Sequence, residues 1–208
     1  EALKNTLKIC KSLPVDFFKD KYINTPVLIA SAGPSLEDNL DFIKENRNKF
    51  VLVAVNSSLR ALVNNDIIPD YCVICENWGI KQNIEDLKNI DDITYILHPR
   101  AQQLSWDINP QRNVYFLTKV DGYSNWYNKF LGNKYALYPS AGSVSLEAFH
   151  IVSQVFGSKE IILVGQDLAF SESKVYANST LKADEEIKIE NGKLIAKSSD
   201  KGQIGRDT

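Results

Sequence analysis

The residue types best suited to chemistry gather in residues 139–170, PSAGSVSLEAFHIVSQVFGSKEIILVGQDLAF. Gly142 and Ser143 stand just before a long apolar stretch, and a serine hydroxyl can cap the unpaired N–H groups of a helix start. We therefore expect a largely buried helix that begins at Ser143 and ends at Gly157, which suits a left-handed cap. A helix start of this kind binds anions, although many such starts hold no ligand.

A predicted strand follows this helix and ends in polar residues. Residues 161–164, Ile-Ile-Leu-Val, are apolar and mostly β-branched, which is typical of a central strand in a parallel sheet. Gly165, Gln166 and Asp167 come next, and ligands of open α/β sheets bind outside the carboxyl ends of strands. A glycine that admits close approach, an amide and a carboxylate thus mark the edge of a candidate site. The alternative is that Asp167 only caps the next element or forms a turn.

The same order of strand, glycine turn and helix occurs earlier in the chain. Residues 26–30 predict a buried strand, and the turn SAGPSL leads from it into a helix. Gly33 is expected to allow a positive φ and the close approach of a ligand, and Ser35 to cap the helix. Free N–H groups and the helix dipole would make this turn, which includes Ala32 and Pro34, an anion-binding site that fits a phosphate. No Gly-Lys-Ser/Thr follows, so the turn is not a P-loop.

Polar residues also follow each of the next three predicted strands. Asn56 and Ser57 follow the first, and we expect them where the ligand of the glycine turn would extend. Glu76 follows the second, where it either joins the site or caps a short helix. His98 follows the third, where it could act as a base or contact a phosphate. These strands are residues 50–55, 71–75 and 93–97.

Strands and helices alternate with short turns along the chain, which favours an α/β fold with a doubly wound, mostly parallel sheet. We expect residues 1–22 to be a helical lead-in and residues 23–180 to be the nucleotide-sugar-binding α/β domain. In residues 181–208, a hairpin around Asn191-Gly192 precedes a polar tail. Because the chain has no methionine and ends in this tail, it reads as a piece of a longer protein.

The first residues predict an amphipathic helix. Leu3, Leu7 and Cys10 recur at helical spacing with lysines between them, which would form one apolar face. The helix should end at or soon after Pro14, which a helix interior does not tolerate. This helix could belong to a neighbouring domain.

Composition argues against several classes of function. The net charge is −2, from 24 basic and 26 acidic residues, so there is no broad basic surface for nucleic acid and no polybasic membrane anchor. No apolar run is long enough for a transmembrane segment and no secretory leader is visible, so we expect a cytoplasmic protein. Cys72 and Cys75 lie in a strand pattern that points them to opposite faces, which favours two small buried residues over metal ligands.

The predicted site offers many neutral hydrogen-bond donors and few cations. Two Gly-Ser helix starts, together with Asn56 and Ser57, suit a nucleotide monophosphate or a sugar nucleotide. A triphosphate would need Lys and Mg²⁺ clamps, so we expect no metal site and no required cofactor. A nucleophilic Ser or Cys triad is not indicated, because Gly-x-Ser-x-Gly is absent and the chain has only 2 histidines.

Three segments together carry a resemblance to a known family. SAGPSL, IIPDYCVICE and SAGSVSLEAFHIVSQVFGSKEIILVGQDLAF resemble the motility accessory factor family, whose central domain is shared with an archaeal hydroxymethylpterin pyrophosphokinase family. The last segment is also similar to bacterial sialyltransferases, in which a Tyr-Ala pair follows, here Tyr176-Ala177. The resemblance covers about residues 23–180. It implies a glycosyltransferase that moves a nonulosonic acid, such as pseudaminic or legionaminic acid, from a CMP donor to Ser or Thr of flagellin or to another protein or glycan acceptor.

The resemblance also implies roles for particular residues. Residues 33–35, Asn56 and the turn that begins with Ser140 and Ala141 would hold the nucleotide. Tyr176 would donate a hydrogen bond to the departing phosphate, and donors aimed at developing charge are often the largest contribution to catalysis.

The general base is open at this stage. Sialyltransferases use a histidine downstream of the Tyr-Ala pair, but His150 is the last histidine of this chain. Asp167, His98 or a residue outside this sequence could serve, and the loop of Asp167 is the best placed.

Two other functions compete with the glycosyltransferase. A pyrophosphokinase would need Mg²⁺ and carboxylates grouped at the strand ends, which Glu76 and Asp167 could supply. A non-catalytic nucleotide-binding module would bind its ligand without turnover.

Overall fold

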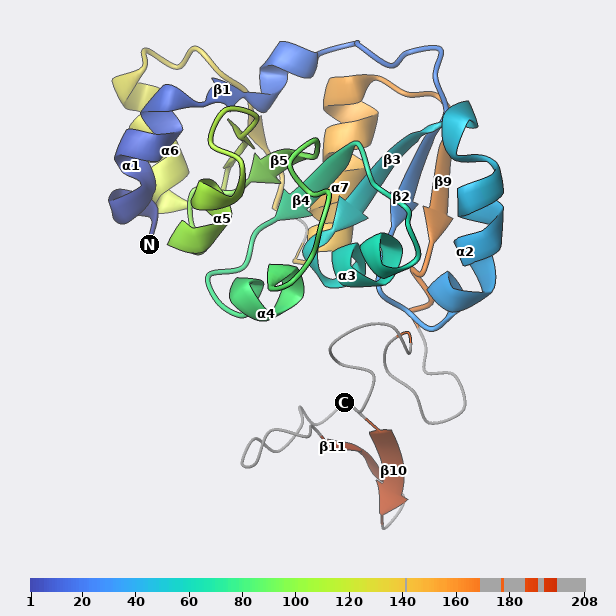
Figure 1. Ribbon diagram of the computed structural model, residues 1–208. Helices are drawn as coiled ribbons and strands as arrows, with labels where there is room; N and C mark the ends of the chain where they lie inside the picture. The colour runs from blue at the N-terminus through green and yellow to red at the C-terminus, as the bar shows by residue number, and fades with distance from the viewer. Residues whose placement is uncertain (141, 169–176, 178–185, 191–192, 198–208) are drawn as a thin grey trace.

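The computed structural model describes residues 1–140, 142–168, 177, 186–190 and 193–197. Its main feature is a seven-stranded sheet with the order β1-β6-β5-β4-β3-β2-β9 (Figure 1). Every neighbouring pair of strands in this sheet is parallel. The strands are β1 (Leu13–Pro14), β2 (Val27–Ala30), β3 (Val51–Val55), β4 (Tyr71–Ile74), β5 (Thr94–Leu97), β6 (Val114–Tyr115) and β9 (Ile161–Val164).

Helices cover both faces of the sheet, which confirms the doubly wound α/β fold. In Figure 1, α7 lies behind the sheet while α2 and α3 lie in front of it. The α-helices are α1 (Ala2–Lys11), α2 (Ser35–Glu45), α3 (Asn56–Asn64), α4 (Ile80–Ile84), α5 (Gln103–Ile108), α6 (Gly122–Phe130) and α7 (Val144–Ile151). A π-helical turn, η3 (Val152–Phe156), continues α7, and two short 3₁₀ turns are η1 (Val15–Phe18) and η2 (Arg47–Lys49).

The side chains of the central strands alternate between two apolar layers. In β2, Val27 and Ile29 are buried in the cluster that α7 and η3 complete. Leu28 and Ala30 are buried in the opposite cluster, which α2 and α3 complete. Because both faces are buried, the strand reads as a continuous apolar run rather than an alternating one.

The strand order places a topological switch point at β2. From β2 the chain proceeds through β3, β4 and β5 to β6 in one direction, whereas β9 pairs on the other side of β2. The carboxyl ends of β2 and β9 therefore lie beside each other at the point where the strand order reverses, which is where open α/β sheets leave a crevice for ligands. The predicted glycine turn and the predicted Gly-Gln-Asp segment both lie at this point.

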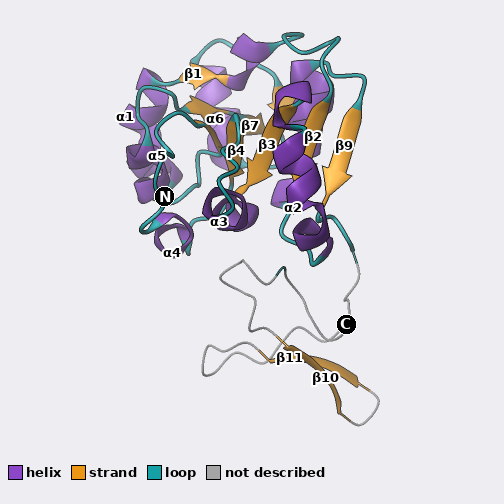
Figure 2. Cartoon of the chain, turned by 45° about the vertical axis from the view of Figure 1, so that its right-hand side comes forward, coloured by secondary structure: helices purple, strands orange, loops and turns teal. Residues whose placement is uncertain are grey.

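The prediction that residues 161–164 form a central strand was wrong. β9 is the edge strand of the sheet, as Figure 2 shows, and half of the Leu163 surface is exposed. The helix that precedes it is also less buried than predicted, because Leu146 and Phe149 of α7 face solvent. An apolar run predicts a strand, but it does not indicate whether that strand lies in the centre or at the edge of the sheet.

The first helix forms as predicted, but its buried side is different. Leu3 and Leu7 are exposed, whereas Asn5 and Ile9 are buried. Asn5 Nδ2 donates to the carbonyl oxygens of Pro99 (2.9 Å) and Ala101 (2.8 Å), which docks α1 on the loop after β5. A polar residue thus faces inward because it satisfies backbone acceptors there.

Several smaller features complete the fold. β7 (Leu117–Thr118) and β8 (Leu137–Tyr138) form a separate parallel pair, and β10 (Glu186–Glu190) and β11 (Lys193–Lys197) form the predicted hairpin. The hairpin turn itself lies outside the described residues. Cys72 and Cys75 pack into different clusters on the two faces of the sheet, as predicted, and burial raises the pKa of both thiols. In the described part of the chain, no helix is long and apolar enough to cross a membrane.

Gly165→Ala should destabilise the chain much more than Gly132→Ala. The two glycines have similar positive φ values, +69° and +74°, so the conformational strain of an alanine is matched. A Cβ at Gly165 would collide with the carbonyl oxygen of Ser31, whereas a Cβ at Gly132 meets no atom within 4 Å. We expect losses of unfolding free energy of at least about 3 kcal/mol and of about 1 kcal/mol, respectively, in urea titrations. Equal losses would contradict the close packing of the β9 and β2 loops.

Candidate functional site

The candidate site is built where the loops after β2 and β9 meet the start of α7. Ser31, which follows β2, has its hydroxyl 2.9 Å from Gln166 Oε1 in the β9 loop and 2.9 Å from Ser145 Oγ in α7. The amide oxygen can only accept, so Ser31 donates its hydroxyl hydrogen to Gln166. This side-chain network ties three segments that are distant in sequence.

A second contact joins the β9 loop to the start of α2. Asp167 accepts a hydrogen bond from the backbone N–H of Ser35 (Oδ2, 2.9 Å), and its Oδ1 accepts from the Ser35 hydroxyl. Asp167 therefore caps α2 from a neighbouring strand, while Ser35 is the first residue of the helix rather than its cap. The contacts of Asp167 are thus those of a residue that caps α2, and its carboxylate is engaged by Ser35.

The role predicted for Gly33 needs correction. Gly33 is not among the residues with positive φ. Its N–H donates to the carbonyl oxygen of Gly165 (2.8 Å), and an added Cβ would lie 2.6 Å from that oxygen and 2.6 Å from Asp167 Oδ2. Gly33 is thus required for the packing of two loops against each other, and the close approach is made by protein atoms.

The capping of α2 changes which helix start can bind an anion. A carboxylate already interacts with the first-turn N–H of Ser35 and with the helix dipole. A phosphate at residues 33–35 would have to displace Asp167 or lie beside a like charge. That this turn holds a phosphate stays a prediction, which would require Asp167 to move, and α7 provides the other helix start at the switch point.

The start of α7 is open to solvent. Gly142 has φ +77°, and an added Cβ there would meet no atom of the described residues within 4 Å. Ser143 caps the helix, as predicted, by accepting from the N–H of Leu146 (3.3 Å). Ser140, Gly142 and Ser143 are exposed, and Ala141 lies outside the described residues. The turn thus combines a capped helix start with free space above it.

Asn56 supplies a buried acceptor at the carboxyl end of β3, the strand next to β2. It follows β3, next to β2, and only 6% of its surface is exposed. Within the described part of the chain, its Oδ1 accepts no hydrogen bond. A buried acceptor without a partner costs about 1–3 kcal/mol, which a ligand or a water molecule at this position would recover. Ser57 is half-buried next to it, and both residues directly follow β3; that they contact a ligand stays a prediction.

Two side chains of α7 were missed by the sequence analysis. Ser145 faces β2 through its contact with Ser31. Glu147 is buried. The pKa of the Cys75 thiol is raised mainly by burial, next by the charge of Glu76 and then by the charge of Glu147. Glu147 and Glu76 thus lie on the β4 side of the site. An acidic residue in the first turn of an apolar helix was the available signal for Glu147.

Glu76 and Asp167 follow strands that are not neighbours in the sheet. Asp167 follows β9 and Glu76 follows β4, with β2 and β3 between them. Three strand spacings of about 4.8 Å separate the two strands by roughly 14 Å. Among the residues that the structure describes, no group of three or more His, Cys, Asp or Glu side chains could hold a metal ion. That this pair binds Mg²⁺ stays a prediction.

His98 lies away from the switch point and is a buried structural residue. It follows β5, which β4 and β3 separate from β2, and 2% of its surface is exposed. Its Nδ1 accepts from the N–H of Arg100 (3.2 Å), and Nε2 lies 3.2 Å from Thr118 Oγ1. Nε2 therefore carries the hydrogen. Burial, aided by the Arg100 charge and opposed by Asp121, lowers the pKa of His98 to about 4.

Residue 177 reaches the switch point, although Tyr176 lies outside the described residues. The N–H of Ala177 donates to the carbonyl oxygen of Ala32 (2.9 Å), and Ala177 is buried. Pro34 follows in the same turn and is half-buried. The Tyr-Ala pair named in the sequence thus connects to the candidate site through its second member, and the role of Tyr176 stays a prediction.

Acid should destabilise the chain through His98. The pKa of His98 is about 4 in the folded chain against an ordinary 6.5, so the unfolded chain binds this proton more tightly. Stability is therefore fully present above the ordinary pKa and is lost as the pH falls towards the folded pKa. From about pH 7 to about pH 5, urea unfolding should show the wild type losing about 2 kcal/mol more than His98→Gln, which does not titrate. Identical losses in the two proteins would show that folding does not lower the pKa of His98.

Comparisons with known proteins agree with this architecture. The fold is similar to that of the MAf glycosyltransferase from Magnetospirillum magneticum AMB-1, with a TM-score of 0.60 and 18% sequence identity over 92% of this chain and 32% of that chain. This chain thus spans about a third of that protein. It is also 24% identical over 195 residues to the 6-hydroxymethyl-7,8-dihydropterin pyrophosphokinase of Methanocaldococcus jannaschii, covering 90% of this chain and 78% of the relative.

The family assignment rests on a match over most of the chain. Residues 1–173 match the family described as 6-hydroxymethylpterin diphosphokinase MptE-like. This range includes both helix starts, the switch point and every strand of the seven-stranded sheet. The resemblance noted in the sequence is thereby confirmed, and the chain belongs to the MptE-like family.

Proposed function

We propose that this chain binds the nucleotide-sugar donor of a glycosyltransferase. The donor would be a CMP-activated nonulosonic sugar, such as pseudaminic or legionaminic acid, and the acceptor a Ser or Thr hydroxyl of flagellin or of another protein or glycan. The observation that carries this proposal is the difference between the two helix starts at the switch point. The α2 start is capped by Asp167, whereas the α7 start is open at Gly142.

The charge of the ligand follows from the donors that the α7 start offers. Ser140, Ser143 and backbone N–H groups are neutral, and the helix dipole adds only partial positive charge. The phosphodiester of a CMP-sugar carries a single negative charge, which such a site balances without a metal ion. As the sugar leaves, the CMP phosphate gains a second negative charge. Fixed donors at this point would therefore stabilise the departing group more than the bound donor.

The buried acceptor of Asn56 gives the site its second contact. Its Oδ1 requires a donor, which the ribose hydroxyls and the cytosine amino group of CMP both provide. The loop of residues 31–35 then serves to position α2 and the β9 loop, and Tyr176 would contact the departing phosphate. The acceptor hydroxyl would attack the anomeric carbon, with its proton taken by a base that residues outside the described ones supply.

A pterin pyrophosphokinase is the second candidate. The family description and the M. jannaschii relative favour it. This reaction would need Mg²⁺ bridging the phosphates of a triphosphate. Glu76 and Asp167, which follow strands β4 and β9, are the carboxylates that the sequence offered for the metal. A nucleotide-binding module without catalysis is the third reading, and it predicts CMP binding with no transfer.

Calorimetry with CMP tests the proposal. The chain should bind CMP equally with and without Mg²⁺, and Gly142→Val should weaken CMP binding at least about tenfold because its side chain fills the open helix start. Gly132→Val is the matched control, since Gly132 has φ +74° and free space but lies after α6. It should cost similar stability and leave CMP binding unchanged.

Two results would contradict the proposal. Wild-type CMP affinity in Gly142→Val would remove the α7 start from the site. Binding of ATP or GTP that depends on Mg²⁺, with no binding of CMP, would favour the pyrophosphokinase.

A further inference from the structure

Helices α1 and α6 pack against each other at the β1 end of the sheet, opposite β9 (Figure 1). The Tyr123 hydroxyl donates to Thr6 Oγ1 (3.0 Å). One turn further along both helices, Cys10 Sγ lies 3.5 Å from the Tyr127 hydroxyl. Because both contacts advance in the same direction along the chain, the two helices run parallel.

The helix pair presents large apolar side chains to solvent on one side. In α1, Leu3 and Leu7 lie beside the contact residues Thr6 and Cys10, and in α6 the corresponding positions follow the same spacing. In two parallel right-handed helices that touch along these lines, both sets fall on the side of the pair that faces away from the sheet. We call this set the α1–α6 apolar face: Leu3, Leu7, Trp126 and Phe130, with exposed fractions of 75%, 77%, 52% and 74%.

The inward side of the helix pair carries several buried polar residues. Asn5 of α1 and Ser124 and Asn128 of α6 are buried. Polar side chains thus face the protein while leucine, tryptophan and phenylalanine face solvent, which is the reverse of an ordinary surface helix. The rings of Trp126 and Phe130 stack on each other with centroids 6.0 Å apart. A contiguous exposed apolar surface of this kind marks a site of interaction.

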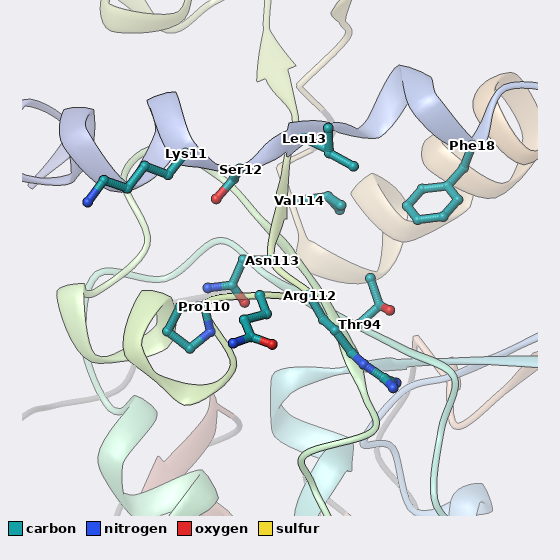
Figure 3. Close-up of a pocket in the computed structure, with 10 residues that line it drawn as sticks. Lys11, Ser12, Leu13, Phe18, Thr94, Pro110, Arg112, Asn113 and Val114 are labelled. Carbon is teal, nitrogen blue, oxygen red and sulfur yellow. The ribbon is translucent and has the colours of Figure 1, made fainter.

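The charged residues beside the α1–α6 apolar face are basic. Lys4 and Lys11 flank it on α1 and Lys129 flanks it on α6, and all three are exposed. Neither helix contains an acidic residue. In Figure 3, the Lys11 side chain extends away from the nearby pocket and towards solvent. Among the residues that the structure describes, Lys11 and Lys129 form no ion pair, whereas Lys4 pairs with Glu1 (3.3 Å).

These margins argue against a second copy of the chain as the partner. If two copies met through this face, α1 of one copy would lie on α1 or on α6 of the other. Both helices carry lysines, so either arrangement would bring like charges together, which is unfavourable. The partner should instead be anionic and should accept apolar side chains.

We propose that the α1–α6 apolar face binds reversibly to the surface of an anionic lipid bilayer. Leucine and phenylalanine side chains enter the boundary of the acyl region, and tryptophan prefers the level of the headgroups. The flanking lysines contact the lipid phosphates. Because α1 and α6 are far apart in sequence, folding alone brings this basic and apolar surface together. The proposed nucleotide site lies at the carboxyl ends of β2, β3 and β9, so the membrane contact goes beyond the proposed function.

Vesicle flotation tests this proposal. The probes are vesicles of phosphatidylcholine alone and vesicles in which about a third of the lipid is phosphatidylglycerol. The chain should bind the anionic vesicles at least about tenfold more tightly, because the lysines contribute only there. Salt at about 0.5 M should remove most of this difference, since it screens charges at the membrane surface.

One pair of variants tests the apolar contact. Phe130→Ser should weaken binding to anionic vesicles at least about fivefold, because an apolar side chain no longer enters the bilayer. Phe42→Ser is the matched control, since Phe42 is also exposed but lies on α2, at the other end of the sheet. It should leave binding unchanged. Circular dichroism should show the same helix content in both variants, because both side chains are exposed.

A second pair of variants tests the charge. Lys11→Gln combined with Lys129→Gln should weaken binding to anionic vesicles at least about fivefold and leave binding to phosphatidylcholine unchanged. The control combines Lys44→Gln with Lys159→Gln, which changes the net charge equally but lies on α2 and just before β9. It should bind anionic vesicles like the wild type.

Three results would overturn the proposal. These are no flotation with anionic vesicles, equal binding to the two kinds of vesicle, and equal effects of Phe130→Ser and Phe42→Ser. A dimer in sedimentation experiments that Phe130→Ser dissociates would assign the face to a second copy instead. Since CMP is absent from these measurements, their failure leaves the proposed nucleotide site intact.

Discussion

The hydrogen bonds between Asp167 and Ser35 are the constraint on which the site depends. They connect the loop after the edge strand β9 to the first turn of α2 and so join the two loops that meet at the switch point. Gly33 and Gly165 must be small because these loops pack at backbone distance. The carboxylate is most useful here as an internal anion, which neutralises a helix start that would otherwise attract one from solution.

This internal capping gives the site its asymmetry. Both α2 and α7 begin near the carboxyl end of β2, on opposite faces of the sheet, but of these two only α7 has an exposed helix start. Ser145 and Ser31 anchor that start to β2, so its position is fixed by the same network that holds Gln166. Asn56 completes the arrangement with an acceptor that the described chain leaves unpaired. A nucleoside monophosphate could supply both groups, with its phosphate at the start of α7 and a hydroxyl or amino donor at Asn56.

The sequence predicted where the strands lie along the chain better than which strands lie next to each other in the sheet. Apolar, β-branched runs located β2, β3, β4, β5 and β9, and the rule that parallel strands end at one edge predicted that their polar loops would gather there. The position of β9 at the edge could not be predicted, because an exposed apolar strand such as Ile161–Val164 reads like a buried one. The short helix α5 carried too few periodic residues to be recognised.

The loops of the candidate site meet at the carboxyl ends of the strands, as expected from the sequence, but several residue contacts differ from the expected ones. Gly33 was expected to approach a ligand, yet its close contacts are with Asp167 and Gly165, which no local pattern reveals. His98 has the right residue type at a strand end, but the strand order places it far from β2. Asn56 could be located from sequence, whereas its unpaired Oδ1 is a property of the packed structure alone.

A crystal structure of the chain with bound CMP tests the central claim most directly. We predict the phosphate within about 3 Å of backbone N–H groups in residues 143–145, with Asp167 still bonded to Ser35. A phosphate bound instead at residues 33–35, with the Asp167 carboxylate displaced from α2, would contradict the account.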